Sequence, residues 1–131
     1  MRRIHLILGL LGVIAFLLTG QFMKHHSPPM QLLTPELRLM YVSRHIYLLG
    51  AALVNFVLGL YLREYATGWR RTLQWIGSVL IFLAALSLLV AFIDEPSLGM
   101  AGRSFRSYFG LIALFAGVMA HFVASFAREA N

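Results

Sequence analysis

Histidine is the residue type in this sequence whose placement points most directly to chemistry. The chain has five histidines and no cysteine, so thiolate ligands and cysteine nucleophiles are excluded. His121 lies inside the apolar run FAGVMAHFVASFA, residues 115–127, and His5 and His45 also lie in apolar runs. Because a charge at the centre of a bilayer costs at least about 2.5–3.5 kcal/mol, an ionisable residue in such a run is a functional candidate.

Haem ligation is the sharper interpretation of these histidines. Two neutral imidazoles on different helices at similar depth form a bis-histidine site for haem b. If the apolar runs alternate in direction, His5 and His121 lie near one membrane face, and His45 lies near the other with His25 or His26. The sequence therefore offers His5, His121, His45 and His26 as candidate haem ligands. The simpler alternative is that His121 forms a hydrogen bond with a carbonyl or a hydroxyl, such as that of Thr19, on a neighbouring helix.

Two further clusters could bind ligands. His25 and His26 are adjacent in KHHSPP, beside methionines, and could bind copper or zinc, although adjacent histidines in a loop are often only solvated. A set of charged residues is expected at the same face as His45, where it could bind the headgroup of a lipid or quinone, or form ion pairs that anchor loops. These residues are Arg38, Arg44, Asp94 and Arg106.

Other kinds of chemistry have little support. Coupled transport of protons or cations usually needs a buried carboxylate. All the acidic residues are expected in loops or at helix ends: Glu36, Glu64, Asp94, Glu95 and Glu129. The sequence also has no nucleophile elbow, glycine-rich phosphate loop or H-E-x-x-H helix, so it does not favour an enzyme.

The elements that must position these residues are transmembrane helices. The chain has 131 residues, of which 60% are hydrophobic and 12% charged, against about 45–50% and 25% in soluble domains. A helix needs about 20 apolar residues to cross the hydrocarbon core, and four runs reach that length. We expect an all-α, four-helix transmembrane bundle that forms one domain over residues 1–131, with helices at 4–23, 35–62, 72–93 and 107–127. A cleaved signal peptide is the alternative for the first run, but its cleavage pattern is poor.

Each expected helix has a face of small or polar residues. In lipid no hydrophobic force joins helices, so close approach along Gly and Ala faces drives their association. The fourth helix shows this most clearly, with Phe115, Met119, Phe122 and Phe126 on its opposite face. Its small face consists of Gly110, Ala113, Gly117, Ala120, His121 and Ala124. The first two helices have similar faces, formed by His5, Gly9, Gly12 and Thr19 and by His45, Ala52, Asn55 and Gly59. The pattern predicts a tight bundle with His121 aimed inward.

The positive charge fits a membrane surface better than a nucleic acid. The net charge is +6, and the arginines flank the apolar runs, where they meet anionic lipid headgroups. Arg2-Arg3 and Arg70-Arg71 favour both termini in the cytoplasm of an inner membrane. We therefore expect a small multi-pass protein that acts as an accessory or scaffolding subunit, packing against other membrane proteins or itself. The alternatives are a b-type haem electron carrier and a binder of lipid or quinone headgroups.

The haem hypothesis predicts a visible spectrum. Protein purified from a haem-replete host should show a Soret band and a sharp reduced α-band. His45→Ala or His121→Ala should abolish both bands by removing an iron ligand. A colourless wild-type protein would contradict haem ligation.

Overall fold

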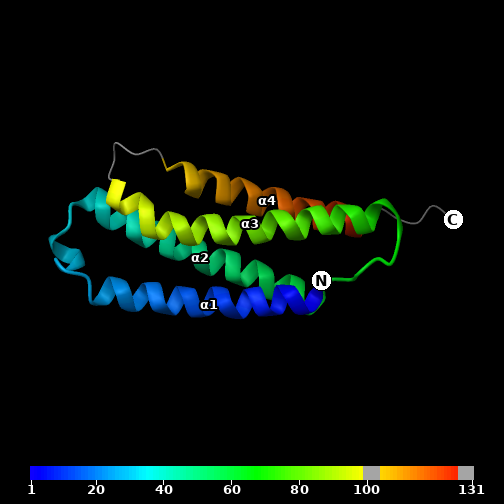
Figure 1. The fold of residues 1–131 in the computed structure, drawn as a ribbon, viewed down its shortest axis with the longest axis horizontal. Helices are drawn as coiled ribbons and strands as arrows, with labels where there is room; N and C mark the ends of the chain where they lie inside the picture. Colours follow the sequence, from blue (N-terminus) through cyan, green and yellow to red (C-terminus); the bar gives the residue numbers. More distant parts are fainter. Residues whose placement is uncertain (99–103, 127–131) are drawn as a thin grey trace.

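The computed structural model describes residues 1–98 and 104–126, and it contains four long helices (Figure 1). The helices are α1 (Arg2–Lys24), α2 (Pro35–Tyr61), α3 (Gly68–Leu98) and α4 (Phe105–Phe126), with a short 3-10 helix, η1 (Met30–Leu32), between α1 and α2. All four long helices are long and apolar enough to cross a membrane. The predicted all-α fold of four transmembrane helices is confirmed, and the final residue of the predicted range 107–127 lies outside the described residues.

The helices form two antiparallel hairpins. α1 packs along α2, α3 packs along α4, and the two hairpins meet mainly where α2 contacts α3. In Figure 1, α1 and α4 lie on opposite sides of the central pair, and the start of α1 lies at the same end as the end of α4. We call this end the His121 end and the opposite end the Arg44 end. Contact between α1 and α3 is sparse, so the bundle is less evenly packed than the sequence predicts.

The start of α2 follows from its local sequence. Thr34 is the N-cap, and its hydroxyl accepts a hydrogen bond from the backbone N–H of Leu37 at 3.4 Å. Pro35 occupies the first helical position, where the missing N–H is not needed, and Glu36 places negative charge in the first turn. The helix therefore begins before the apolar run, as the sequence predicts.

α3 is longer than expected and corrects one prediction. It continues through Asp94, Glu95 and Pro96 to Leu98, where the sequence suggested a loop. Glu95 lies in the last turn of α3, a helix end as predicted, but it is only 2% exposed, so the expectation that no acidic residue supplies a buried carboxylate is wrong for this residue. The physical reason is tertiary, because Arg44 on α2 and Ser107 on α4 supply hydrogen bonds to the buried carboxylate.

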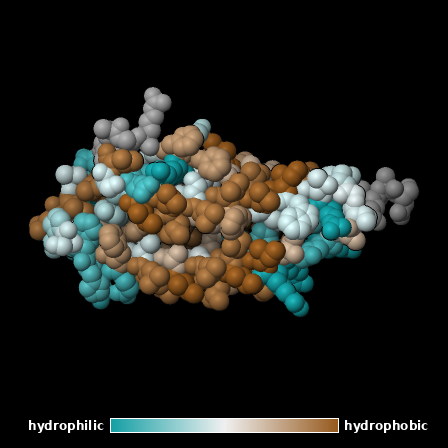
Figure 2. Space-filling view, viewed as in Figure 1, coloured by the Kyte–Doolittle hydropathy of each residue, from teal (hydrophilic) through white to brown (hydrophobic). Residues whose placement is uncertain are grey.

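The small-residue faces lie where the sequence placed them. Every residue of the predicted small face of α4 is buried, while Phe115, Phe122 and Phe126 are exposed. A Cβ added at Gly117 would lie 2.6 Å from Cγ1 of Ile81 and 2.8 Å from the carbonyl oxygen of Gly77, so the two backbones nearly touch. Figure 2 shows hydrophobic surface across the middle of the molecule and hydrophilic groups toward its ends, as expected for contact with a lipid bilayer.

The close approach of α3 and α4 predicts a difference between two glycines. Gly117→Ala should lower the melting temperature, with a loss of about 1–3 kcal/mol from overpacking. Gly50→Ala is the matched control, because an added Cβ there meets no atom within 4 Å and alanine favours a helix. Thermal unfolding in detergent measures both variants, and an unchanged Gly117→Ala protein would contradict the packing account.

Candidate functional site

A chain of polar side chains, buried except for the partly buried Ser78, connects all four helices at the His121 end. Nδ1 of His5, on α1, lies 2.8 Å from Oδ1 of Asn55 on α2. Nε2 of His5 lies 2.9 Å from the hydroxyl of Ser78 on α3. The same hydroxyl lies 3.3 Å from Nε2 of His121 on α4. The two imidazole rings meet edge to face, with centroids 5.7 Å apart.

The direction of these hydrogen bonds is fixed by one backbone carbonyl. The amide nitrogen of Asn55 donates to the carbonyl of Ala51 at 2.9 Å, so its Oδ1 must be the atom that faces His5. Nδ1 of His5 therefore donates, and Nε2 of the neutral ring accepts the hydrogen of Ser78. The sulfur of Met1, 3.8 Å from the same hydroxyl, is a weaker acceptor. Nε2 of His121 must then donate to Ser78.

This arrangement leaves one acceptor unused within the chain. The tautomer that donates from Nε2 makes Nδ1 of His121 an acceptor. Nδ1 is buried and has no hydrogen-bond partner among the described residues, and the whole side chain is only 3% exposed. The donors of His5, Ser78 and His121 are therefore all engaged, and the chain of hydrogen bonds retains capacity to accept.

A groove runs beside this chain between α1 and α3. It consists of three cavities of about 230–280 Å³ each, arranged in series. The cavity at the His121 end is lined by His5, Ser78 and Trp75 together with apolar side chains, and it shares Leu8 and Phe82 with the middle cavity. The middle cavity shares Leu89 with the third, which reaches Tyr41 and Phe92 near the Arg44 end.

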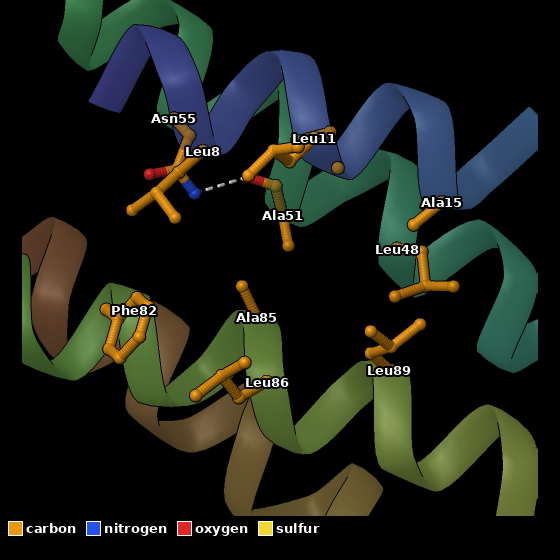
Figure 3. A pocket seen from close by; sticks show the side chains of 12 residues that line it. Leu8, Leu11, Ala15, Leu48, Ala51, Asn55, Phe82, Ala85, Leu86 and Leu89 are labelled. Carbon is orange, nitrogen blue, oxygen red and sulfur yellow. Dashed lines mark hydrogen bonds between the residues drawn. The ribbon is translucent and has the colours of Figure 1, made fainter. Parts of the chain in front are cut away.

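Figure 3 shows the middle cavity from close by. Leu8, Leu11 and Ala15 come from α1, and Phe82, Ala85, Leu86 and Leu89 face them from α3. α2 contributes Leu48, Ala51 and Asn55, and the hydrogen bond from Asn55 to Ala51 keeps the polar amide engaged at the cavity wall. The cavity lining is therefore almost wholly apolar, although it lies next to a polar chain.

Aromatic side chains occupy the other end of the groove. The ring of His26 packs against Phe22 and Tyr41, and Phe92 contacts both Phe22 and Tyr41. His45 stacks on Phe16 with ring centroids 4.0 Å apart, and its Nδ1 lies 2.9 Å from the hydroxyl of Thr19. Thr19 thus pairs with His45, while the hydroxyl that pairs with His121 is that of Ser78.

A buried ion pair joins the two hairpins at the Arg44 end. Nε of Arg44 donates to Glu95 at 2.8 Å, and the two side chains are almost fully enclosed. The backbone N–H and the hydroxyl of Ser107, in the first turn of α4, also donate to this carboxylate. The other guanidinium nitrogens of Arg44 donate to Ser43 and Ser104. Glu95 therefore neutralises Arg44 and caps the N-terminus of α4.

The predicted headgroup cluster is divided between different environments. Arg106 and Asp94 form an ion pair of 2.9 Å on the surface, and Arg38 is exposed near the start of α2. Arg44 is only 8% exposed, and its nitrogens donate to protein oxygens. The structure therefore does not bring the four residues together, and headgroup binding by them stays a prediction.

The predicted haem and metal ligands are partly brought together. His5 and His121 meet at one depth, but the Ser78 hydroxyl lies between their Nε2 atoms, so an iron placed there requires that hydroxyl to move. Among the described residues, His45 packs against Phe16, whereas His26 packs against Phe22 and Tyr41, so these two histidines do not share a site. His25 and His26 each place Nδ1 against a backbone carbonyl, and the described residues contain no cluster of three metal-ligating side chains. Haem and metal binding stay predictions.

Several residues of the site were not predicted from the sequence. Ser78 and Glu95 were missed because a serine in an apolar run and an acid before proline carry no distinctive local signal. Gln74, fully buried in α3, donates to the carbonyl of Arg63 and accepts from the N–H of Tyr65, and so fixes the connection from α2 to α3. Its position in an apolar run was the available signal.

Surface hydrogen bonds also join the start of α1 to the end of α2 at the His121 end. The Arg2 side chain donates to the carbonyls of Gly59 and Leu60 at the end of α2, where it complements the helix dipole. The backbone N–H of Arg2 donates to Glu64 at 2.7 Å, and this hydrogen bond lowers the pKa of the Glu64 carboxyl. These contacts hold the start of α1 against the end of α2.

Comparison with protein-family models, curated proteins and solved structures finds no match to this chain.

The ion pair predicts a strong contrast between two neighbouring acids. Glu95→Gln should destabilise the protein by about 3–5 kcal/mol, because it leaves the buried charge of Arg44 without a counterion. Asp94→Asn breaks only the exposed pair with Arg106 and should cost less than about 1 kcal/mol. Thermal or denaturant unfolding in detergent compares the two variants. Equal losses would show that burial of the Arg44–Glu95 pair does not matter to stability.

Proposed function

We propose that this membrane protein binds the hydrocarbon chain of a membrane amphiphile in the groove between α1 and α3, and presents or stores it as an accessory component of the membrane. The observation that carries the proposal is the series of three neighbouring cavities between these helices, which share Leu8, Phe82 and Leu89 in their walls. Sites of this kind, apolar with a few polar groups at one end, are typical of small-molecule binding between the helices of bundles.

The chemistry of the lining favours a flexible chain. Its side chains are mainly leucine, alanine and phenylalanine, which match a hydrocarbon and offer few hydrogen bonds. The groove follows α1 from His5 to Phe22, and at about 1.5 Å per residue this length is comparable with the hydrocarbon core. An acyl or isoprenoid chain of a neighbouring lipid could therefore lie along most of its length.

A transmembrane helix of a partner protein is the competing occupant. A helix is about 10 Å wide with its side chains, so it would lie over the groove and could enter each cavity only with single side chains. In that case the protein would act as the scaffolding subunit expected from its composition, and a copurifying protein would replace the bound chain.

Native mass spectrometry of detergent-purified protein tests the proposal. The wild-type protein should retain one amphiphile of low molecular mass, which can be identified after extraction. Ala85→Phe should lose at least about nine-tenths of it, because a phenyl ring enters the middle cavity. Leu83→Phe, on the exposed surface of the same helix, is the matched control and should retain the ligand.

Two results would contradict binding of a hydrocarbon chain in the groove. The first is wild-type protein without any retained amphiphile, also after incubation with a lipid extract. The second is equal retention by Ala85→Phe and the wild type. Retention of a second protein in place of the amphiphile would instead favour the scaffolding role.

A further inference from the structure

We infer that the cavity beside His5 and Ser78 accepts a ring that bears a hydroxyl group, and that it selects the hydroquinone form of an isoprenoid quinone over the oxidised form. The inference rests on the proposed function, because it names the head of the amphiphile whose chain lies in the groove. It goes further by assigning the redox form from the direction of hydrogen bonds.

The size and lining of this cavity suit a single ring. Its volume is about 260 Å³, and an apolar cavity of about 150 Å³ already holds benzene. Trp75, Phe82 and His5 supply ring surfaces, and apolar side chains complete the wall. A planar ring of benzene size with small substituents therefore fits.

The position of the cavity suits the head of an amphiphile. It lies at the start of α1, where Met1 and Ile4 also line it, and so near the end of the bundle. The middle cavity is its neighbour toward the centre of the bundle, and Leu8 and Phe82 line both cavities. A ring held beside His5 can thus extend its isoprenoid tail along the groove.

The hydrogen-bond chain determines what the head must offer. Nδ1–H of His5 donates to Asn55, the Ser78 hydrogen goes to His5, and Nε2–H of His121 goes to Ser78. His5 and Ser78, the members of the chain that line this cavity, have no donor left for a ligand, but the Ser78 oxygen retains a second lone pair. A ligand hydroxyl can donate to that lone pair without disturbing any existing bond.

A quinone carbonyl meets the opposite situation. It can only accept, so the Ser78 hydroxyl would have to turn away from His5 to reach it. That rotation leaves Nε2 of the buried His5 without a partner, and an unsatisfied buried polar atom is costly. The indole N–H of Trp75, which also lines the cavity, does not distinguish the two forms, because both carry an oxygen that accepts. The hydroquinone should therefore bind more tightly by about tenfold, the factor expected for one such hydrogen bond.

Calorimetric titration with two matched probes tests the inference. The probes are a benzoquinone with a decyl tail and its hydroquinone, the latter kept reduced under anaerobic conditions. Wild-type protein in detergent should bind the hydroquinone about tenfold more tightly. Ser78→Ala should bring the two dissociation constants together, whereas Ser78→Thr, which keeps a hydroxyl, should preserve the preference.

Ser87→Ala is the matched control on the same helix. The Ser87 hydroxyl donates to the carbonyl of Arg106 and does not line the groove, so the preference should remain. Thermal unfolding of every variant shows whether it is folded, and Ser78→Thr keeps the test decisive if Ser78→Ala does not fold.

The outcomes separate this inference from the proposed function. If both probes bind equally to the wild type and Ala85→Phe excludes both, the groove still binds a hydrocarbon chain, but the selectivity for the hydroquinone is overturned. Tighter binding of the quinone also overturns it, as does a preference that survives Ser78→Ala. If neither probe binds and no amphiphile is retained in mass spectrometry, the proposed function itself fails.

Discussion

The hydrocarbon core of a membrane offers no hydrogen-bond partner, and the arrangement of this bundle depends on that constraint. Each buried polar side chain must find its partner on another helix or on its own backbone. At one end His5, Asn55, Ser78 and His121 form hydrogen bonds with one another across all four helices. At the other end Arg44 and Glu95 do the same across the two hairpins. These polar contacts therefore fix how the hairpins meet, and apolar packing between α2 and α3 supports them.

Side-chain size decides where the helices touch and where they separate. Gly117 and Gly77 allow α3 and α4 to approach until the backbones meet, and Gly12 does the same for α1 against Ala52 of α2. Between α1 and α3 the facing residues are instead large, including Leu8 and Phe82, and contacts are few. Large side chains on two helices that do not interdigitate leave cavities. The groove is thus a consequence of tight packing within each hairpin.

The proposed ligand site combines these two features. The groove supplies an apolar path open to the bilayer, and the polar chain supplies one chemical requirement at its end. That requirement follows from Asn55, whose amide is oriented by the Ala51 carbonyl and which in turn sets the proton positions on His5. Asn55, which lines the middle cavity and not the cavity of the ring, therefore determines which head group the Ser78 oxygen can receive.

The sequence by itself determined the membrane environment of the protein, its fold class and the helix faces that turn toward the interior of the bundle. Runs of apolar residues specify transmembrane helices, and the spacing of Gly110, Gly117 and His121 places them on one buried face, because helical periodicity is a local property. Only the tertiary structure decided the partners. Ser78 lies 43 residues from His121, and Glu95 lies 51 from Arg44, so no local pattern relates them. The groove likewise depends on how two hairpins meet, which helical periodicity alone does not specify.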